Sequence, residues 1–211
     1  MRFNNPQYMK SNKKVHIVGI TGGIGCGKSV VSQLFFHRGI AVYDCDNRAK
    51  ELMVKHLSLR KALIHLVGEE LFKDGVFNKP LLTNFLFSNI ENKAKLDALV
   101  HPVVKADFRQ WVADHSVSTL LVIESALLFE AGFTDEVDSV LVVSSPLELR
   151  LKRIMNRDHM SLDLAKRKMQ FQMDEEKKIQ LADLVIHNDE RHSLIEQINL
   201  FVLRLEQNPL C

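Results

Sequence analysis

The chain has 211 residues, enough for one sizeable domain with insertions or for two small ones. Its composition, with 46% hydrophobic and 26% charged residues, is ordinary for a globular protein. The 28 basic and 26 acidic residues leave a net charge of only +2, so no overall electrostatic field marks a nucleic acid or a membrane as a partner.

The N-terminal segment, residues 1–14, is polar and lacks the apolar centre of a signal peptide, so the sequence predicts a disordered extension there. No apolar run further along approaches the roughly 18 residues of a membrane span. The three cysteines, Cys26, Cys45 and Cys211, have neither metal-ligand spacing nor the pattern of a disulfide framework. We therefore expect a cytoplasmic protein.

Short apolar runs predict the strands of a sheet. Each run is nearly continuous rather than alternating in polarity, which is typical of strands that are buried on both faces of a parallel sheet. Helical patterns separate the runs, so the sequence predicts an α/β fold with a five-stranded parallel sheet flanked by helices. The predicted strands are residues 15–20, 40–43, 120–123, 139–143 and 184–187.

Two intervals between these strands are longer than one crossover connection needs. Residues 49–117 have a mostly helical pattern and predict a helical insertion that leans over the edge of the sheet. Residues 150–177 are strongly charged, with Arg150, Arg153 and Arg157 on one helical face, and predict a helical lid. The nucleotide-binding core would then consist of residues 15–48, 118–149 and 178–211.

The stretch GGIGCGKS, residues 22–29, matches the phosphate-binding pattern G-x-x-x-x-G-K-[ST]. Glycines let backbone N–H groups approach phosphate oxygens closely, and the following helix adds the positive end of its dipole. The stretch also follows a predicted strand and precedes an amphipathic helix, which is the context that the motif requires. We therefore expect a bound nucleoside triphosphate, with Lys28 on the β- and γ-phosphates and the Ser29 hydroxyl on Mg²⁺.

A phosphate loop alone does not separate a kinase from a GTPase or a motor. The chain lacks the N-K-x-D pattern that reads guanine and is short for a large ATPase, so a small-molecule kinase is favoured. Asp44 and Asp46 follow the second predicted strand, at the edge where α/β sheets bind ligands. They either orient an acceptor hydroxyl or cap the next helix, and the residues alone leave both possibilities open.

Several stretches resemble the dephospho-coenzyme A kinase family in the order in which that family has them, along almost the whole chain. They are VGITGGIGCGKS, VYDCDNRAK, LVHPVV, ALLFEAGF, RIMNRDHMS and LADLVIHND. The resemblance implies a P-loop kinase fold and transfer of the ATP γ-phosphate to the ribose 3′-hydroxyl of dephospho-CoA. It also implies Mg²⁺ as cofactor, with ATP and dephospho-CoA as the partners.

The resemblance further implies roles for particular residues. Asp44 resembles the general base on the 3′-hydroxyl, Lys28 joins it in catalysis, and Asp46 and His101 lie with it in the substrate site. Residues 49–117 resemble the helical CoA-binding domain. The implied ATP-binding residues are Gly23, Gly25, Cys26, Gly27, Lys28, Ser29, Val30, Arg153 and Arg157.

Three positions depart from the family pattern: Ala126 replaces a proline, and Lys50 and Lys168 replace arginines. Arginine and lysine differ in donor geometry, so two-point contacts at the lysine positions are in doubt. Two rival functions remain open at this stage. One is another small-molecule kinase, acting on a nucleoside or nucleotide, and the other is a regulatory protein that binds ATP without an acceptor.

Single residues also have more than one interpretation. Pro102 biases His101 away from a helical conformation, so His101 either packs at a helix junction or faces the substrate. We expect Arg150 to be a surface charge along the lid. Glu130 is read as a solvated start of a helix. The chain is expected to be a monomer or a small homo-oligomer.

Overall fold

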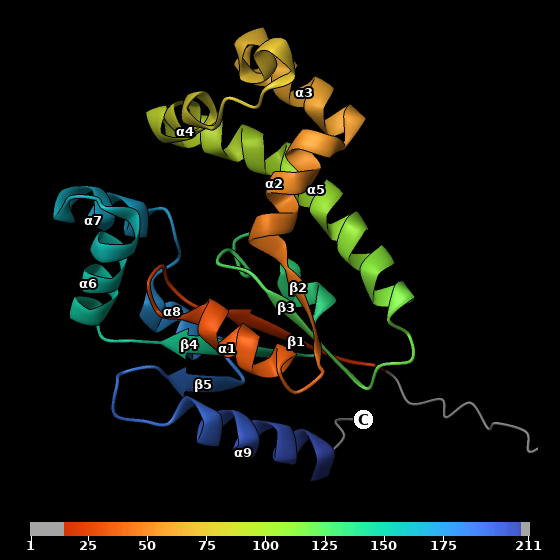
Figure 1. The fold of residues 1–211 in the computed structure, drawn as a ribbon, viewed down its shortest axis with the longest axis vertical. Helices are drawn as coiled ribbons and strands as arrows, with labels where there is room; N and C mark the ends of the chain where they lie inside the picture. Colours follow the sequence, from red (N-terminus) through yellow and green to blue (C-terminus); the bar gives the residue numbers. More distant parts are fainter. Residues whose placement is uncertain (1–14, 208–211) are drawn as a thin grey trace, which may run out of the picture.

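A single parallel sheet forms the centre of the computed structural model, which describes residues 15–207 (Figure 1). The strand order is β2-β3-β1-β4-β5, and every neighbouring pair is parallel. The predicted five-stranded parallel α/β fold is therefore confirmed, with strand ends that differ from the predicted runs by at most one residue. The predicted extension, residues 1–14, lies outside the described residues. The strands are β1 (His16–Thr21), β2 (Ala41–Asp44), β3 (Leu120–Glu124), β4 (Ser139–Ser144) and β5 (Leu184–His187).

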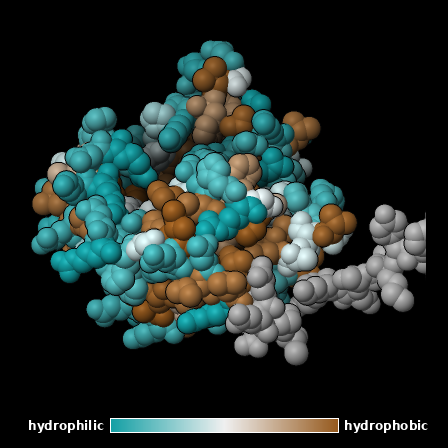
Figure 2. Space-filling view, turned by 60° about the horizontal axis from the view of Figure 1, so that its bottom comes forward, coloured by the Kyte–Doolittle hydropathy of each residue, from teal (hydrophilic) through white to brown (hydrophobic). Residues whose placement is uncertain are grey.

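One face of the sheet is covered by α1 (Lys28–Phe36) and α9 (Leu194–Gln207). Successive strand residues point to opposite faces, so Val122 and Leu141 pack toward these two helices while Ile123 and Val142 pack on the other side. Both faces are apolar, which explains why the strand sequences are continuous apolar runs. On the outside, hydrophobic residues gather over the part of the surface where α1 and α9 lie, bordered by hydrophilic ones (Figure 2).

The chain between β2 and β3 is helical and rises above one end of the sheet (Figure 1). We call its four α-helices the insertion. Its apolar side chains share one core with Ile123 and Val142 of the sheet, so the insertion packs directly on the strands. The insertion comprises α2 (Cys45–Lys55), α3 (Leu57–Val67), a 3₁₀ segment η1 (Glu69–Gly75), α4 (Lys79–Ser88) and α5 (Ile90–Asp114).

Of the two interpretations of His101, the helix junction is wrong, and contact with the substrate stays a prediction. Both His101 and Pro102 lie inside α5, which continues for 25 residues. Val100, Val104 and Phe108 are buried on one side of this helix, and their packing outweighs the local preference of a residue that precedes proline.

The C-terminal half begins with η2 (Phe133–Glu136) before β4 and continues with a pair of helices beside the sheet, α6 (Leu147–Asp158) and α7 (Leu162–Gln170). We call α6 and α7 the lid. A short helix, α8 (Glu175–Gln180), leads from the lid into β5. No helix in the part of the chain from residue 15 to 207 is long and apolar enough to cross a membrane.

Candidate active site

The phosphate loop connects β1 to α1 at the carboxyl end of the central strand. Gly22 has a φ of 149°, and a Cβ atom on it would lie 2.3 Å from the carbonyl oxygen of Val143, so only glycine fits. Gly27 has a φ of 94° and ends the loop where α1 begins. The Lys28 ammonium folds back over the loop and donates to the carbonyl oxygen of Gly22 at 3.1 Å. Backbone N–H groups, a helix start and an ammonium therefore converge on one anion-binding concavity.

Ser29, the residue after this lysine, donates its hydroxyl proton to Glu124 Oε1 at 3.1 Å. Glu124 is the last residue of β3, which pairs directly with β1. Burial raises the pKa of Glu124, while the hydroxyl groups of Ser32 and Ser29 and the charge of Lys28 act in the opposite direction. Sequence reasoning missed Glu124, although its place at the carboxyl end of a predicted strand was a usable signal.

The side-chain oxygen atoms of Ser29 and Glu124 are suitable ligands for a magnesium ion. Mg²⁺ prefers oxygen ligands and usually takes one or two from the protein, with phosphate oxygens and water completing its octahedron. Within residues 15–207 there is no group of three or more His, Cys, Asp or Glu side chains that would hold a metal alone. A site completed by nucleotide phosphates is therefore the kind that these residues fit.

The two aspartates after β2 have different surroundings. Asp44 caps α2: its Oδ1 accepts the N–H of Asn47 at 2.9 Å and its Oδ2 accepts the Asn47 side-chain amide at 2.6 Å. Asp46 lies two residues further along the chain, and its side chain is exposed to solvent. The protein atoms crowded around Asp46 raise its pKa, Lys28 lowers it and Asp44 raises it. The charge of Lys28 in the phosphate loop therefore acts on Asp46.

Asp46 also lines a cavity of about 130 Å³ between the sheet edge and the insertion. His101 reaches the same cavity from α5, with its Nε2 3.6 Å from Asp97 Oδ1. Burial lowers the pKa of His101, and Asp97 acts against that shift. The cavity is smaller than a typical pocket for a whole small molecule, so it would hold only part of a ligand. Most of its wall is apolar and includes Ala49, Met53, Val100, Leu127 and Phe133.

Asp44 lines a different hollow, a groove of about 460 Å³ on the outer side of β2. Asp107 stands at the centre of its wall, where it accepts the Tyr43 hydroxyl at 2.8 Å and two N–H groups of Arg48, each at 2.7 Å. The structure thus brings Asp46 and His101 together in one cavity and leaves Asp44 beside another.

The lid arginines are engaged by protein groups. Arg153 donates to Ser145 Oγ at 3.0 Å and pairs with Glu190 at 3.2 Å. Arg157 pairs with its neighbour Asp158. In the described part of the chain, neither arginine bonds to the phosphate loop, although both lie on α6, which also carries Arg150.

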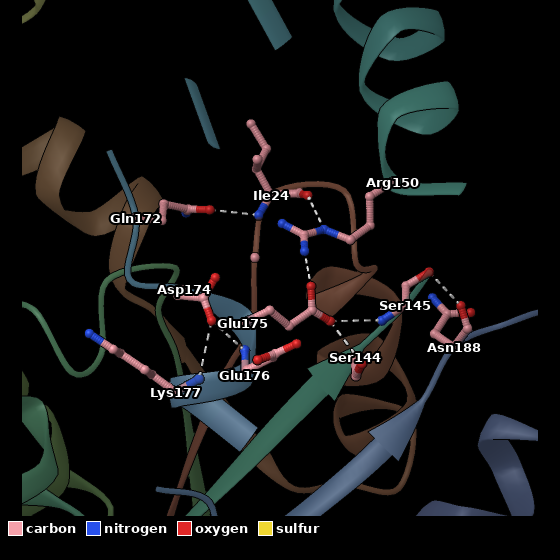
Figure 3. A network of polar contacts seen from close by, with 12 residues as sticks. Ile24, Ser144, Ser145, Arg150, Gln172, Asp174, Glu175, Glu176, Lys177 and Asn188 are labelled. Carbon is pink, nitrogen blue, oxygen red and sulfur yellow. Dashed lines mark hydrogen bonds and ion pairs between the residues drawn. The ribbon is translucent and has the colours of Figure 1, made fainter. Parts of the chain in front are cut away.

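Arg150, expected to be a surface charge, is buried against the phosphate loop (Figure 3). Its Nε donates to the carbonyl oxygen of Ile24 at 3.1 Å, and its guanidinium pairs with Glu175. The guanidinium lies where a side chain on Gly23 would be, because a Cβ there would come within 2.1 Å of it. The expectation is wrong because a glycine far away in sequence opens the space that Arg150 fills.

The segment between α7 and α8 completes these contacts with the loop. Gln172 Oε1 accepts the N–H of Ile24 at 2.7 Å, so both polar backbone atoms of Ile24 are bound by side chains from the lid side (Figure 3). Glu175 also accepts the Ser144 hydroxyl at 2.8 Å, which anchors the segment to the end of β4. The loop is therefore held in shape from both sides.

A family model described as dephospho-CoA kinase matches residues 16–193 of this chain. The chain belongs to the dephospho-CoA kinase family. Proteins named dephospho-CoA kinase from Bacteroides fragilis and Porphyromonas gingivalis are 42% and 38% identical to it. The matches cover 86% of this chain in both cases, and 88% and 90% of the two relatives.

Solved structures agree with this membership. A Thermus thermophilus structure has a TM-score of 0.80 at 31% identity and covers 91% of this chain and 98% of its own. Dephospho-CoA kinase from Campylobacter jejuni has a TM-score of 0.65 at 26% identity, with 92% and 98% covered. Shikimate kinase from Acinetobacter baumannii, at 14% identity and a TM-score of 0.54 over 94% and 97%, shares the fold alone. The predicted P-loop kinase fold and family resemblance are confirmed.

The positions that depart from the dephospho-CoA kinase pattern have partners in this chain. Lys50 donates to Asn47 Oδ1 at 2.9 Å, and Lys168 lies 3.9 Å from Asp158. The carbonyl oxygen of Ala126 accepts the ammonium of Lys178 at 3.0 Å. Lys50 and Lys168 thus each make one contact with a protein side chain, not the two-point contact that an arginine could make.

Glu130, read as a solvated start of a helix, instead belongs to a buried ion pair. Its Oε1 lies 3.2 Å from the ammonium of Lys178, which is fully buried, and accepts the N–H of Met173 at 2.7 Å. The helical reading failed because residues 126–131 form turns, and α8, nearly fifty residues later, supplies the partner.

Proposed function

We propose that this protein phosphorylates the ribose 3′-hydroxyl of dephospho-CoA with ATP, giving CoA and ADP. The observation that carries the proposal is the position of the phosphate loop, whose Lys28 is near enough to lower the pKa of Asp46, a residue that lines a cavity under the insertion. Membership of the dephospho-CoA kinase family supports the choice of substrate. The family also disfavours the two rivals, a nucleoside or nucleotide kinase and an ATP-binding regulatory protein.

The reaction is an in-line phosphoryl transfer. The bond between the γ-phosphorus and the β–γ bridging oxygen breaks, a bond from the 3′-oxygen to the γ-phosphorus forms, and ADP leaves. The protein contributes mainly by positioning the reactants and by stabilising developing charge. Gly23 and residues 25–30 would bind the ATP phosphates, whereas the N–H of Ile24 is bound to Gln172. Lys28 would lie against the transferred group.

The hydroxyl proton needs an acceptor. We assign this role to Asp46, because Asp46 shares a cavity with His101, whereas Asp44 caps α2 and lines a different groove. The raised pKa of Asp46 makes it a better base than an ordinary aspartate. Asp44, which the family resemblance suggested as the base, would instead hold α2 and so fix Asp46. His101 would contact the substrate from α5.

Bound Mg²⁺ would supply neutralisation of phosphate charge, and Ser29 with Glu124 are the residues that would hold it. In the proposed arrangement α6 and α7 would close over the nucleotide, with Arg153 and Arg157 exchanging their present partners for phosphates. Residues 49–117 would receive dephospho-CoA. The buried thiols of Cys26 and Cys45 suit a reducing compartment, so we place the reaction in the cytoplasm.

The test is ADP production from MgATP on addition of dephospho-CoA, with adenosine, AMP, CMP and shikimate as parallel acceptors. We expect turnover with dephospho-CoA alone, and CoA as the product by mass spectrometry. Turnover with another acceptor would support a kinase activity but show that the substrate is not dephospho-CoA. ATP binding without turnover on any acceptor would favour the regulatory reading.

A further inference from the structure

A buried lysine lies behind the cavity and has no part in the reaction as described. Lys178 of α8 is fully buried, and its ammonium contacts two oxygen atoms, the carbonyl of Ala126 at 3.0 Å and Glu130 Oε1 at 3.2 Å. Burial lowers the pKa of Lys178, and the Glu130 carboxylate opposes that shift. Replacing such a pair by apolar residues often costs no stability, so stability alone does not explain its presence.

Both partners of Lys178 belong to residues 125–131, which follow β3 in a series of turns. We call this segment the acceptor turn. Ser125, Leu127 and Ala131 of the acceptor turn line the cavity that also contains Asp46 and His101. Lys178 therefore binds the wall of the proposed acceptor site at two points, Ala126 and Glu130.

The acceptor turn also contacts the proposed base. The backbone N–H of Ala126 faces the Asp46 carboxylate and lowers its pKa. Ser125 and Leu127, on either side of Ala126, line the same cavity as Asp46. Lys178 binds the carbonyl oxygen of Ala126, so a shift of the turn would change the immediate surroundings of Asp46.

The Lys178–Glu130 ion pair is also connected to the phosphate loop. Glu130 Oε1 accepts the N–H of Met173, and the preceding residue, Gln172, accepts the N–H of Ile24 in the phosphate loop. The Lys178–Glu130 pair is therefore the point where the acceptor turn meets the segment that holds the loop.

We propose that Lys178 is a positioning residue that fixes the acceptor turn, and with it Asp46, relative to the phosphate loop. This inference rests on the proposed function. Lys178 touches no substrate in this scheme, so its loss should slow the chemical step and leave ATP binding intact. Misplacement of a reacting group by about 1 Å is enough to cost on the order of 100-fold in rate.

The experiment compares the double variant Lys178→Met, Glu130→Gln with Lys178→Arg. The double variant removes the bond to Ala126 without leaving an unpaired buried charge, whereas Lys178→Arg keeps a donor for both oxygens. For the double variant we expect kcat to fall about 10- to 100-fold. Its KM for ATP should stay within about threefold of the wild-type value, and Lys178→Arg should keep kcat within about threefold.

Two results would overturn the inference. One is a folded double variant with kcat within about threefold of the wild type; the other is an equal loss of ATP binding and turnover, which indicates a structural role only. If the double variant does not fold, Lys178→Arg decides, and an equal loss of ATP binding and turnover in that variant refutes the role. Wild-type turnover is the reference. If the wild-type protein is inactive on dephospho-CoA, the result contradicts the proposed function and not the role of Lys178.

Discussion

At the scale of single residues, the two aspartates after β2 make opposite predictions on replacement by asparagine. Asparagine still caps a helix, so Asp44→Asn should keep α2 in place and leave kcat within about threefold of the wild type. Asp46→Asn removes the proposed proton acceptor, so kcat should fall by at least about 100-fold while ATP binding is kept. Steady-state kinetics on dephospho-CoA measure both variants.

The two variants are matched because each changes one carboxylate to an amide within three residues of sequence. A larger fall in kcat for Asp44→Asn than for Asp46→Asn would identify Asp44 as the general base, as the family resemblance suggested. Thermal unfolding of both variants checks that neither loss of rate comes from loss of fold.

At the scale of elements, the segment between α7 and α8 should strengthen ATP binding, because its Gln172 holds the phosphate loop. Gln172→Leu keeps the size of the side chain but removes the acceptor for the N–H of Ile24. One neutral hydrogen bond contributes about 1 kcal/mol, so the KM for ATP should rise about fivefold. Glu176→Ala, an exposed change on the neighbouring helix α8, is the control and should leave the KM unchanged. An unchanged KM in Gln172→Leu would show that the loop holds its shape without this contact.

A second prediction at this scale concerns the contact between α2 and α5. Hydrogen bonds from Arg48 hold the pKa of Asp107 below its ordinary value, partly offset by burial. A lowered folded-state pKa stabilises the fold above the ordinary aspartate pKa of about 4, and this contribution is lost as the pH falls through the folded-state value. Asp107→Asn should therefore lower the free energy of unfolding by about 1 kcal/mol at pH 7.

The difference between wild type and Asp107→Asn should shrink when urea unfolding is repeated near pH 3, where the wild-type carboxylate begins to take up its proton. Glu51→Gln serves as the control, since Glu51 is a more exposed partner of the same arginine. A constant difference between pH 7 and pH 3 would mean that Asp107 acts by packing rather than by charge.

At the scale of the whole molecule, the insertion and the sheet should unfold together, because their side chains belong to one apolar core. The chain contains a single tryptophan, Trp111, and it lies on α5, where it packs against Tyr43 of the edge strand β2. Its fluorescence therefore reports on the insertion, whereas far-ultraviolet circular dichroism reports on all helices and strands. The two urea transitions should coincide within error. An earlier fluorescence transition would show an insertion that melts on its own.

The same scale explains what could be predicted from sequence. The strands and the phosphate loop depend on local pattern, and the structure has the strands within one residue of the predicted runs. Glu124 and Gln172 escaped because their importance depends on strand order, which brings distant segments beside residues 22–29. The burial of Arg150 was not predicted because its guanidinium fills the space that a side chain on Gly23 would occupy. Long-range packing decided the partners in each of these cases, and the one local signal was the place of Glu124 at the carboxyl end of a predicted strand.

The central position of β1 also has a consequence for how the protein is made. The neighbours of β1 are β3 and β4, which begin at Leu120 and Ser139, so the strand emerges from the ribosome roughly 100 residues before its first partner. At about 5 to 20 residues per second, the apolar strand waits for roughly 5 to 20 seconds of translation. Throughout that delay VHIVGIT is an exposed hydrophobic segment on a nascent chain. The same strand that anchors the phosphate loop is thus the segment on which a ribosome-associated chaperone would act first.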